Sequence, residues 1–296
     1  MKQILKKTLL VLILPTSSIV ATNSLDFSSL VEEFMNQSGV LKKTINLSGK
    51  QRMLTQYMSK LVLQIELNVQ KKESMEKLEE LASLYDTTLK AFKNGDSKMG
   101  IPKASNKDVL IQITKVENLW KDFYVHIQTI SKNKDNGESF KYIMSNNEKL
   151  LALSNELVKA YELSNTSENY LEVSRLSVVN VAGRQRMLTQ KMTKEKLLIL
   201  RGDKRVREKL LKTVKLFDDS LNALIQGDES QKITKATNKK ITKQLQVVLK
   251  MWNTLEPLYI KEKTSAKEMA IILSKNTKLL KEMNSMVQLS EVEVEY

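Results

Sequence analysis

Two stretches of the chain have almost the same sequence. Residues 46–60 read NLSGKQRMLTQYMSK and residues 180–194 read NVAGRQRMLTQKMTK, so ten of the fifteen positions are identical at an offset of 134. Self-similarity at a fixed period is typical of chains that contain repeated structural units. We therefore expect the two stretches to occupy equivalent places in two related units.

The likeness continues on the C-terminal side of each stretch. The offset between matching positions drifts from 134 to 129, which indicates that the insertions lie in loops. We expect one helical unit over residues 25–164 and a second over residues 165–296. Examples of the matching pairs are Gly95 and Gly227, Trp120 and Trp252, and Asn147 and Asn276.

Each unit is predicted to be an antiparallel four-helix bundle, so the expected fold class is all-α. Leu54, Met58, Leu61 and Ile65 follow the spacing of a buried helical stripe. The 296 residues include only 8 Gly and 3 Pro, which favours long helices. We expect these boundaries in the first and the second unit respectively. The first helix should end near Asn68 or Gly202, and the second should end at Gly95 or Gly227. The third should begin near Ser105 or Thr237, and the fourth should span 139–162 or 265–291. Within the third helix of the second unit, Pro257 should kink or end the helix.

The N-terminus has the pattern of a secretory signal. Lys2, Lys6 and Lys7 precede an apolar run over residues 9–14, and small and polar residues follow. The run is shorter than the roughly 20 residues that span a bilayer. We expect residues 1–21 to be a signal peptide and the chain to reach a bacterial periplasm. If this segment is not cleaved, it would anchor the chain in the inner membrane.

The composition excludes several function classes. The chain has no Cys and a single His, His126, which excludes a thiolate or His-cluster metal site and a cysteine nucleophile. No phosphate-binding glycine loop or carboxylate dyad is present, so we expect neither an enzyme nor a cofactor. The net charge of +14 favours anionic neighbours without identifying one, and nucleic acid is not an expected partner of an exported chain.

The repeated stretches place polar residues on one helix face. A glycine inside a helix costs about 1 kcal/mol relative to alanine, so its presence in both copies suggests that another group approaches the backbone closely. In the first copy the face comprises Asn46, Gly49, Arg52, Met53, Gln56 and Lys60, and in the second copy it comprises Asn180, Gly183, Arg186, Met187, Gln190 and Lys194.

The two faces can meet across a pseudo-twofold axis, which would bring Arg52 and Arg186 together. Two unpaired guanidinium groups repel each other, so this arrangement favours an anion between them, and a small planar oxyanion fits the guanidinium fork. The spacing leaves a second interpretation open. The motif could instead serve packing, with each arginine bonded to carboxylates or to carbonyl groups at a helix end.

The motif Asn-x-x-Gly-x-Gln-Arg-Met-Leu-Thr-Gln resembles the signature of the PilJ/NarX-like sensor domain, and here it occurs twice. Such domains stand at the N-terminus of type IV pilus chemotaxis transducers and of nitrate/nitrite sensor kinases. In the nitrate sensors the domain is a periplasmic four-helix bundle, and Gly and Arg of two copies hold one anion. The resemblance implies that Gly49, Arg52, Gly183 and Arg186 bind the anion. From their place on the same helix faces, we expect these supporting residues: Asn46, Met53, Gln56, Asn180, Met187 and Gln190.

The expected function is therefore a sensory module that binds a small anion, nitrate or nitrite first. The nitrate sensors continue into a second membrane helix and cytoplasmic signalling domains, and this sequence contains neither. We expect it to signal through a separate membrane-bound sensor kinase or chemotaxis transducer. The alternative is a ligand-free structural protein, such as an adaptor associated with the pilus or the cell envelope.

Overall fold

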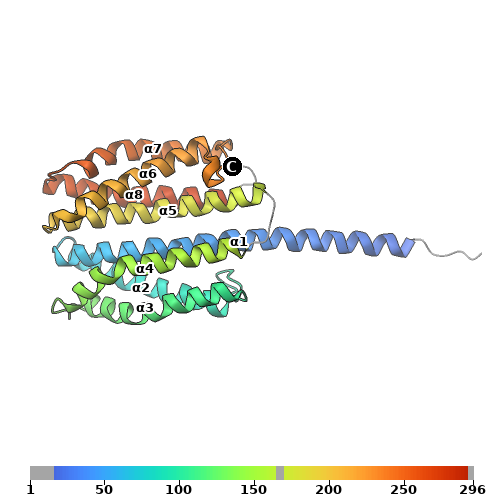
Figure 1. The fold of residues 1–296 in the computed structure, drawn as a ribbon, viewed down its shortest axis with the longest axis horizontal. Helices are drawn as coiled ribbons and strands as arrows, with labels where there is room; N and C mark the ends of the chain where they lie inside the picture. The colour runs from blue at the N-terminus through green and yellow to red at the C-terminus, as the bar shows by residue number, and fades with distance from the viewer. Residues whose placement is uncertain (1–16, 165–169, 293–296) are drawn as a thin grey trace, which may run out of the picture. The chain divides into compact units, whose positions relative to one another are not determined.

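The computed structural model describes the backbone of residues 17–164 and 170–292, and the side chains of residues 40–164 and 173–292. Residues 1–38 and residues 39–296 are two separate compact units, and both repeated stretches lie in the second. The described residues form eight α-helices and two short 3-10 helices (Figure 1). In chain order these are α1 (Ser17–Glu66), α2 (Lys71–Asn94), α3 (Lys107–Ser131), α4 (Glu138–Leu163), α5 (Tyr170–Leu200), η1 (Lys204–Val206), α6 (Arg207–Gln226), η2 (Glu229–Gln231), α7 (Lys239–Ile260) and α8 (Ala266–Val292).

The all-α prediction is confirmed, and the helices begin and end for local reasons that recur in both repeats. Beyond α1 and α5 the chain turns through Asn68 and Gly202, which have φ angles of 57° and 108°. Left-handed backbone of this kind favours glycine and asparagine. At the start of α3 and α7, the side chains of Asn106 and Asn238 accept hydrogen bonds from two backbone N–H groups each.

Helices α2 and α6 end at Gly95 and Gly227, as expected. Their φ angles are 81° and 87°, and a Cβ atom at either position would lie 2.9 Å from the backbone nitrogen of Lys103 or Lys235. A residue with a side chain would be strained at both positions. The two equivalent loops therefore turn tightly into the third helix of each repeat.

Pro257 does not end its helix, because α7 continues to Ile260. Proline lacks an N–H group and deprives the carbonyl of the residue four positions earlier, Asn253, of its helical partner. Asn253 is exposed, so water can satisfy that carbonyl. The alternative that Pro257 terminates the helix was therefore wrong.

Each repeat buries an apolar core. Leu54, Met58, Leu61 and Ile65 are all buried, as their spacing predicted. Trp120 and Trp252 are also buried, and the indole N–H of each donates a hydrogen bond to Asp86 or Asp218 on the preceding helix.

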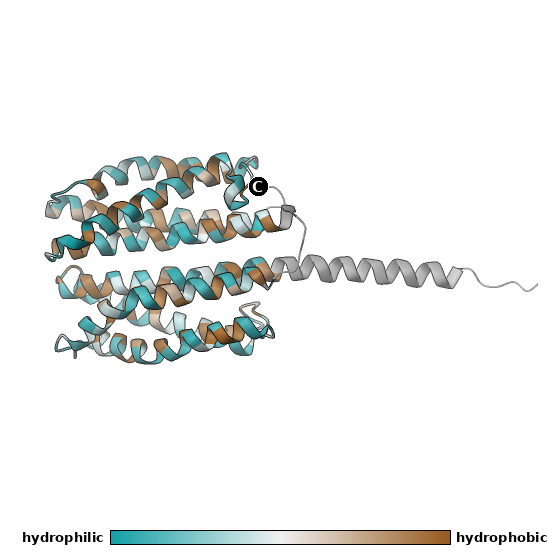
Figure 2. Ribbon diagram, viewed as in Figure 1, coloured by the Kyte–Doolittle hydropathy of each residue, from teal (hydrophilic) through white to brown (hydrophobic). Residues whose placement is uncertain are grey.

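Hydrophobic and hydrophilic residues both occur along the helices of residues 40–164 and 173–292 (Figure 2). Among the described residues, no helix is both long enough and apolar enough to cross a membrane.

Two predictions concern residues that the structure does not fully describe. The signal peptide, residues 1–21, lies outside the residues with described side chains. The predicted boundary between the two repeats, after residue 164, adjoins residues 165–169, which are also outside the described chain. Both assignments stay predictions.

Candidate functional site

The guanidinium groups of Arg52 on α1 and Arg186 on α5 lie next to each other. A Cβ atom at Gly49 would be 3.2 Å from Nη2 of Arg52 and 3.8 Å from Nη2 of Arg186. A Cβ atom at Gly183 would be 3.4 Å from Nη2 of Arg186 and 3.5 Å from Nη2 of Arg52. Both glycines therefore leave room for arginine head groups, and each faces the arginines of both repeats.

The two arginines have equivalent hydrogen bonds, all to uncharged acceptors. Nη2 of Arg52 donates to Oδ1 and to the carbonyl oxygen of Asn180 at 2.7 and 3.2 Å, and Nη1 donates to Oδ1 of Asn155. Nη2 of Arg186 donates to Oδ1 and to the carbonyl oxygen of Asn46 at 2.6 and 3.2 Å. Its Nη1 donates to Oδ1 of Asn284. Each arginine thus reaches across to the motif of the other repeat.

Carboxylates lie one step further out. The side-chain amide of Asn180 donates to Glu162 at 2.8 Å, near the end of α4. Glu291, near the end of α8, is in the equivalent position beside Asn46; burial raises its pKa, and hydrogen bonding with Asn46 and the charge of Arg186 oppose that rise. Each asparagine therefore separates an arginine from a carboxylate.

Four of these residues were missed in the sequence analysis. Asn155 and Asn284 contact the arginines directly, and Glu162 and Glu291 contact the asparagines. Both pairs match at the same offset of 129 as Asn147 and Asn276. This shared offset was the available signal, because polar residues that repeat late in each fourth helix are candidates for a common role.

Burial dominates the electrostatics of the site. Arg52 and Arg186 are 2 % and 1 % exposed. Burial lowers the pKa of Arg52 to about 9, with the charge of Glu162 acting in the opposite direction and the charges of Arg184 and Arg186 adding to the decrease. Burial lowers the pKa of Arg186 to about 10, opposed by Glu291. A lowered pKa means that the positive charge is under-compensated where it lies.

Several polar atoms of the motif have no partner among the described residues. These atoms are Nε of both arginines and Oε1 of Gln51, Gln56, Gln185 and Gln190. Unsatisfied buried polar atoms are rare in native proteins and suggest that a further group completes the site. Gln56 and Gln190 are fully buried, and the amide nitrogen of each donates only to the preceding threonine hydroxyl.

The remaining residues of the predicted face are buried too. Met53 and Met187 are 7 % and 8 % exposed and belong to the apolar core. Lys60 and Lys194 lie further along the helices and donate hydrogen bonds to Asn276 and Asn147 of the opposite repeat. The structure therefore brings the Asn, Gly and Arg positions of both motifs together, whereas the Met and Lys positions lie around them.

The chain matches a known family twice. A family model described as the N-terminal domain of type IV pili methyl-accepting chemotaxis transducers, PilJ, matches residues 34–139 and 174–279. The two matches correspond to the two repeats of the structure and include both motifs. No curated protein matches the chain.

Proposed function

Because the chain belongs to the PilJ family of type IV pili methyl-accepting chemotaxis transducer N-terminal domains, we propose that it is a periplasmic sensory module for a small anion. The anion would lie between α1 and α5, held by Arg52 and Arg186 beside Gly49 and Gly183. Nitrate and nitrite are the first candidates. Their support is the resemblance of the Gly-x-x-Arg-Met motif to that of nitrate sensors.

The observation that carries the proposal is the pair of buried guanidinium groups without a carboxylate in contact. All six of their hydrogen bonds go to amide or carbonyl oxygens. Removing one charge from water is costly unless an opposite charge compensates it, and two like charges side by side increase that cost. An anion between them would supply the missing charge.

The chemistry of the site favours a small planar oxyanion. A guanidinium group presents N–H donors in one plane, which suits paired, charge-assisted bonds to an oxyanion. The approximate twofold relation of the two motifs favours a ligand that presents equivalent oxygen atoms to both sides. The Nε atoms without partners are additional donors for such a ligand.

Binding at this place would couple the two repeats. Each arginine contacts an asparagine of the other motif, so an anion that attracts the guanidinium groups would change contacts between α1 and α5. A ligand shifts a conformational equilibrium only by its difference in affinity for the two states. We propose that a membrane-bound chemotaxis transducer or sensor kinase recognises the state that the anion favours.

Isothermal titration calorimetry of the purified chain with nitrate, nitrite, chloride and sulfate tests the proposal. We expect nitrate or nitrite to bind more tightly than chloride or sulfate. Arg52→Gln and Arg186→Gln retain a hydrogen-bonding amide but remove the charge, and each should weaken binding at least about tenfold, since a charge pair would be lost. Either substitution should suffice because both arginines face the same point.

The matched control is Arg205→Gln, which removes a positive charge from a side chain that is 91 % exposed and pairs with Asp203. It should leave binding unchanged. Absence of heat with every anion, or equal heat from the wild type and the Arg52→Gln/Arg186→Gln double variant, would contradict the proposal. Circular dichroism of each variant establishes that loss of binding is not loss of fold.

One observation favours the alternative of a ligand-free adaptor. Each guanidinium group already donates three hydrogen bonds without any ligand. On this alternative the arginines join the repeats, so Arg52→Gln would lower the midpoint of thermal unfolding by the same amount with and without nitrate. On the sensory proposal, nitrate would stabilise only the wild type.

A further inference from the structure

Lys60 and Lys194 occupy equivalent positions in the two motifs, but their surroundings differ. Nζ of Lys194 donates to Asn147 at 2.6 Å and forms an ion pair with Glu148 at 2.5 Å. Nζ of Lys60 donates to Asn276, which is the counterpart of Asn147, and lies 4.1 Å from the centre of the Tyr57 ring. Lys60 has no carboxylate within ion-pair distance among the described residues.

The difference arises from three substitutions between the repeats. Around Lys194, the carboxylates of Glu148 and Glu195 form ion pairs with Lys194 and Lys191. The positions equivalent to these carboxylates carry Thr277 and Leu61, and the position equivalent to Lys191 carries Tyr57. The motif lysine of the second repeat therefore has carboxylates beside it, one from each repeat, whereas the equivalent surroundings of Lys60 contain neither acid.

Lys60 is 3 % exposed, so its ammonium group lies where water barely reaches it. No carboxylate of the described residues compensates its charge there. Burial lowers its pKa to about 7. A buried ammonium group normally pairs with an anion, because the loss of hydration is otherwise not recovered. The ammonium group of Lys60 is therefore suited to bind the carboxylate of a ligand.

A cavity of about 280 Å³ lies beside Lys60. Polar side chains of Tyr57, Gln64, Gln70 and Thr277 contribute to its wall. The other charged residues of the wall are Glu73 and Lys77; Glu73 is exposed, and Lys77 forms an ion pair with Glu80 at 2.8 Å. Of the cations in this wall, Lys60 is thus the one without a carboxylate partner.

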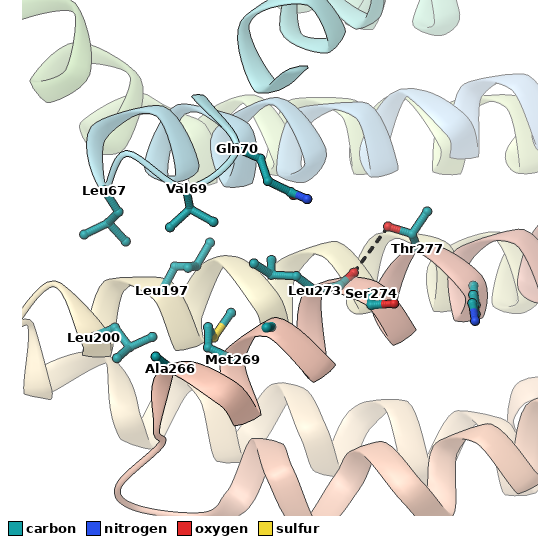
Figure 3. A pocket seen from close by; sticks show the side chains of 12 residues that line it. Leu67, Val69, Gln70, Leu197, Leu200, Ala266, Met269, Leu273, Ser274 and Thr277 are labelled. Carbon is teal, nitrogen blue, oxygen red and sulfur yellow. Dashed lines mark hydrogen bonds between the residues drawn. The ribbon is translucent and has the colours of Figure 1, made fainter. Parts of the chain in front are cut away.

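The polar cavity adjoins an apolar groove of about 780 Å³, since both are lined by Gln70, Leu273 and Thr277. In Figure 3, Leu67 and Val69 face Leu197, Leu200 and Met269 across the groove, while Gln70 and Thr277 lie at its polar end. The volume of the groove is in the range of sites for small organic ligands, about 300–1,000 Å³. A charged end joined to an apolar wall matches an amphipathic ligand.

We propose that this groove binds a fatty acid or a similar aliphatic monocarboxylate, with its carboxylate on Lys60 and its hydrocarbon tail against Leu197, Leu200 and Met269. The carboxylate occupies the place that Glu148 has beside Lys194. The tail removes apolar surface of the ligand from water, which gives preference to long chains over short ones. This site is separate from the one proposed at Arg52 and Arg186.

Calorimetry with decanoate, below the concentration at which it forms micelles, tests the proposal on the full chain. We expect saturable binding of decanoate, with acetate and the uncharged decanol each binding at least about tenfold more weakly, because each lacks one of the two interactions. Equal binding of decanol, or of acetate, would overturn the proposal. So would absence of decanoate binding.

Thr277→Glu is the sharpest variant, because it introduces beside Lys60 the acid that Lys194 already has in Glu148. It should weaken decanoate binding at least about tenfold while raising the midpoint of thermal unfolding. Weaker binding could then not be assigned to misfolding. The matched control is Thr254→Glu, which places a carboxylate on an exposed residue of α7. Wild-type decanoate affinity in Thr277→Glu would overturn the proposal, as would equal weakening by Thr254→Glu.

Lys60→Met provides the complementary test. It removes the charge and retains much of the apolar volume, so decanoate binding should weaken at least about tenfold whereas decanol binding should not. Lys194→Met removes the equivalent charge of the other repeat and should leave decanoate binding intact. Unchanged decanoate binding in Lys60→Met would overturn the proposal, and nitrate binding in the same variant keeps this result independent of the anion site.

Discussion

Nη2 of Arg52 donates a hydrogen bond of 2.7 Å to Oδ1 of Asn180, which lies in the other repeat. The reciprocal bond, from Arg186 to Asn46, measures 2.6 Å. Each repeat therefore supplies the acceptor for the arginine of the other, and the polar face of either motif is incomplete without its partner. An anion at this place would contact the joint between the two repeats and not a pocket inside one of them.

Asn180→Asp should block the anion site without unfolding the protein. A carboxylate at this position would lie against Nη2 of Arg52 and take the place of the external anion, so we expect nitrate affinity to fall at least about tenfold. Asn46→Asp should have the same effect through Arg186. Calorimetry with nitrate measures the affinity, and thermal unfolding measures the stability. We expect the stability to change little, because the new attraction to Arg52 is offset by repulsion from Glu162, whose carboxylate accepts a hydrogen bond from the Asn180 amide in the wild type.

The control for this prediction is Asn253→Asp, which introduces the same charge at an exposed position on α7. A comparable loss of nitrate affinity in this control would point to a general effect of net charge. Retention of wild-type affinity in both Asn180→Asp and Asn46→Asp would contradict the placement of the anion between the arginines.

Gly49→Ala should separate anion binding from stability. Alanine is favoured over glycine in a helix by about 1 kcal/mol, whereas its methyl group would lie 3.2 Å from Nη2 of Arg52 and 3.8 Å from Nη2 of Arg186. We expect a change in the free energy of unfolding of no more than about 1 kcal/mol in either direction, because the close neighbour is the end of a flexible side chain. Urea denaturation measures this change.

Nitrate affinity should fall in the same variant, since the methyl group occupies space next to both guanidinium groups. Gly183→Ala is the graded comparison, because its methyl group would meet the arginines at 3.4 and 3.5 Å. We expect the weaker effect there. Full nitrate affinity in the double variant would show that the glycines serve the approach of the arginines and not that of a ligand.

The helices were largely predictable because the signals that end them are local. Asn68 and Gly202 adopt left-handed backbone, and Gly95 and Gly227 end the second helices, as residues of these types tend to do. Pro257 shows where local reasoning fails. The cost of a proline inside a helix depends on whether water can reach the carbonyl that loses its partner, and exposure is set by the tertiary structure.

The site was predictable only in part. The repetition of Gly49 and Arg52 as Gly183 and Arg186 identified the central residues, because an interior glycine is unfavourable in a helix without a reason. The acceptors Asn155 and Asn284 belong to the fourth helices, and their contacts depend on how α4 and α8 pack against the motif helices. Sequence spacing along one helix contains no information on that packing.

Asp218→Ala should destabilise the second repeat. Oδ1 of Asp218 accepts the hydrogen bond from the indole N–H of Trp252 at 3.0 Å, and Trp252 is fully buried. Loss of this acceptor would leave a buried donor unpaired, which costs about 1–3 kcal/mol. Urea denaturation should show this decrease in the free energy of unfolding, and Asp86→Ala should act in the same way through Trp120.

Asp219→Ala is the matched control, because the neighbouring carboxylate is exposed and pairs only with Lys215 on the surface. Exposed pairs contribute little to stability. If Asp219→Ala lowered the free energy of unfolding as much as Asp218→Ala, the bond to Trp252 would not be the cause.

Lys60→Met should stabilise the protein in the absence of ligands, and the gain should depend on pH. Burial lowers the pKa of Lys60 from 10.5 to about 7. Below pH 7 the side chain is charged in both the folded and the unfolded chain, so the folded protein bears the full cost of a buried charge. Between about pH 7 and 10.5 the unfolded chain binds the proton and the folded chain does not, so the stability of the wild type rises with pH relative to the variant.

The stabilisation by Lys60→Met, measured by urea denaturation, should therefore be largest at pH 6 and should shrink steadily towards pH 10. Glu73, Lys77 and Tyr57 also face this cavity and remain present in both proteins, so their titration largely cancels in the difference. Lys194→Met should stabilise less than Lys60→Met, because burial also lowers the pKa of Lys194 but the charge of Glu148, with which it pairs, opposes that decrease. A pH-independent difference between the wild type and Lys60→Met would mean that Lys60 keeps its proton throughout, and that its charge is compensated by a group other than Asn276 and the Tyr57 ring.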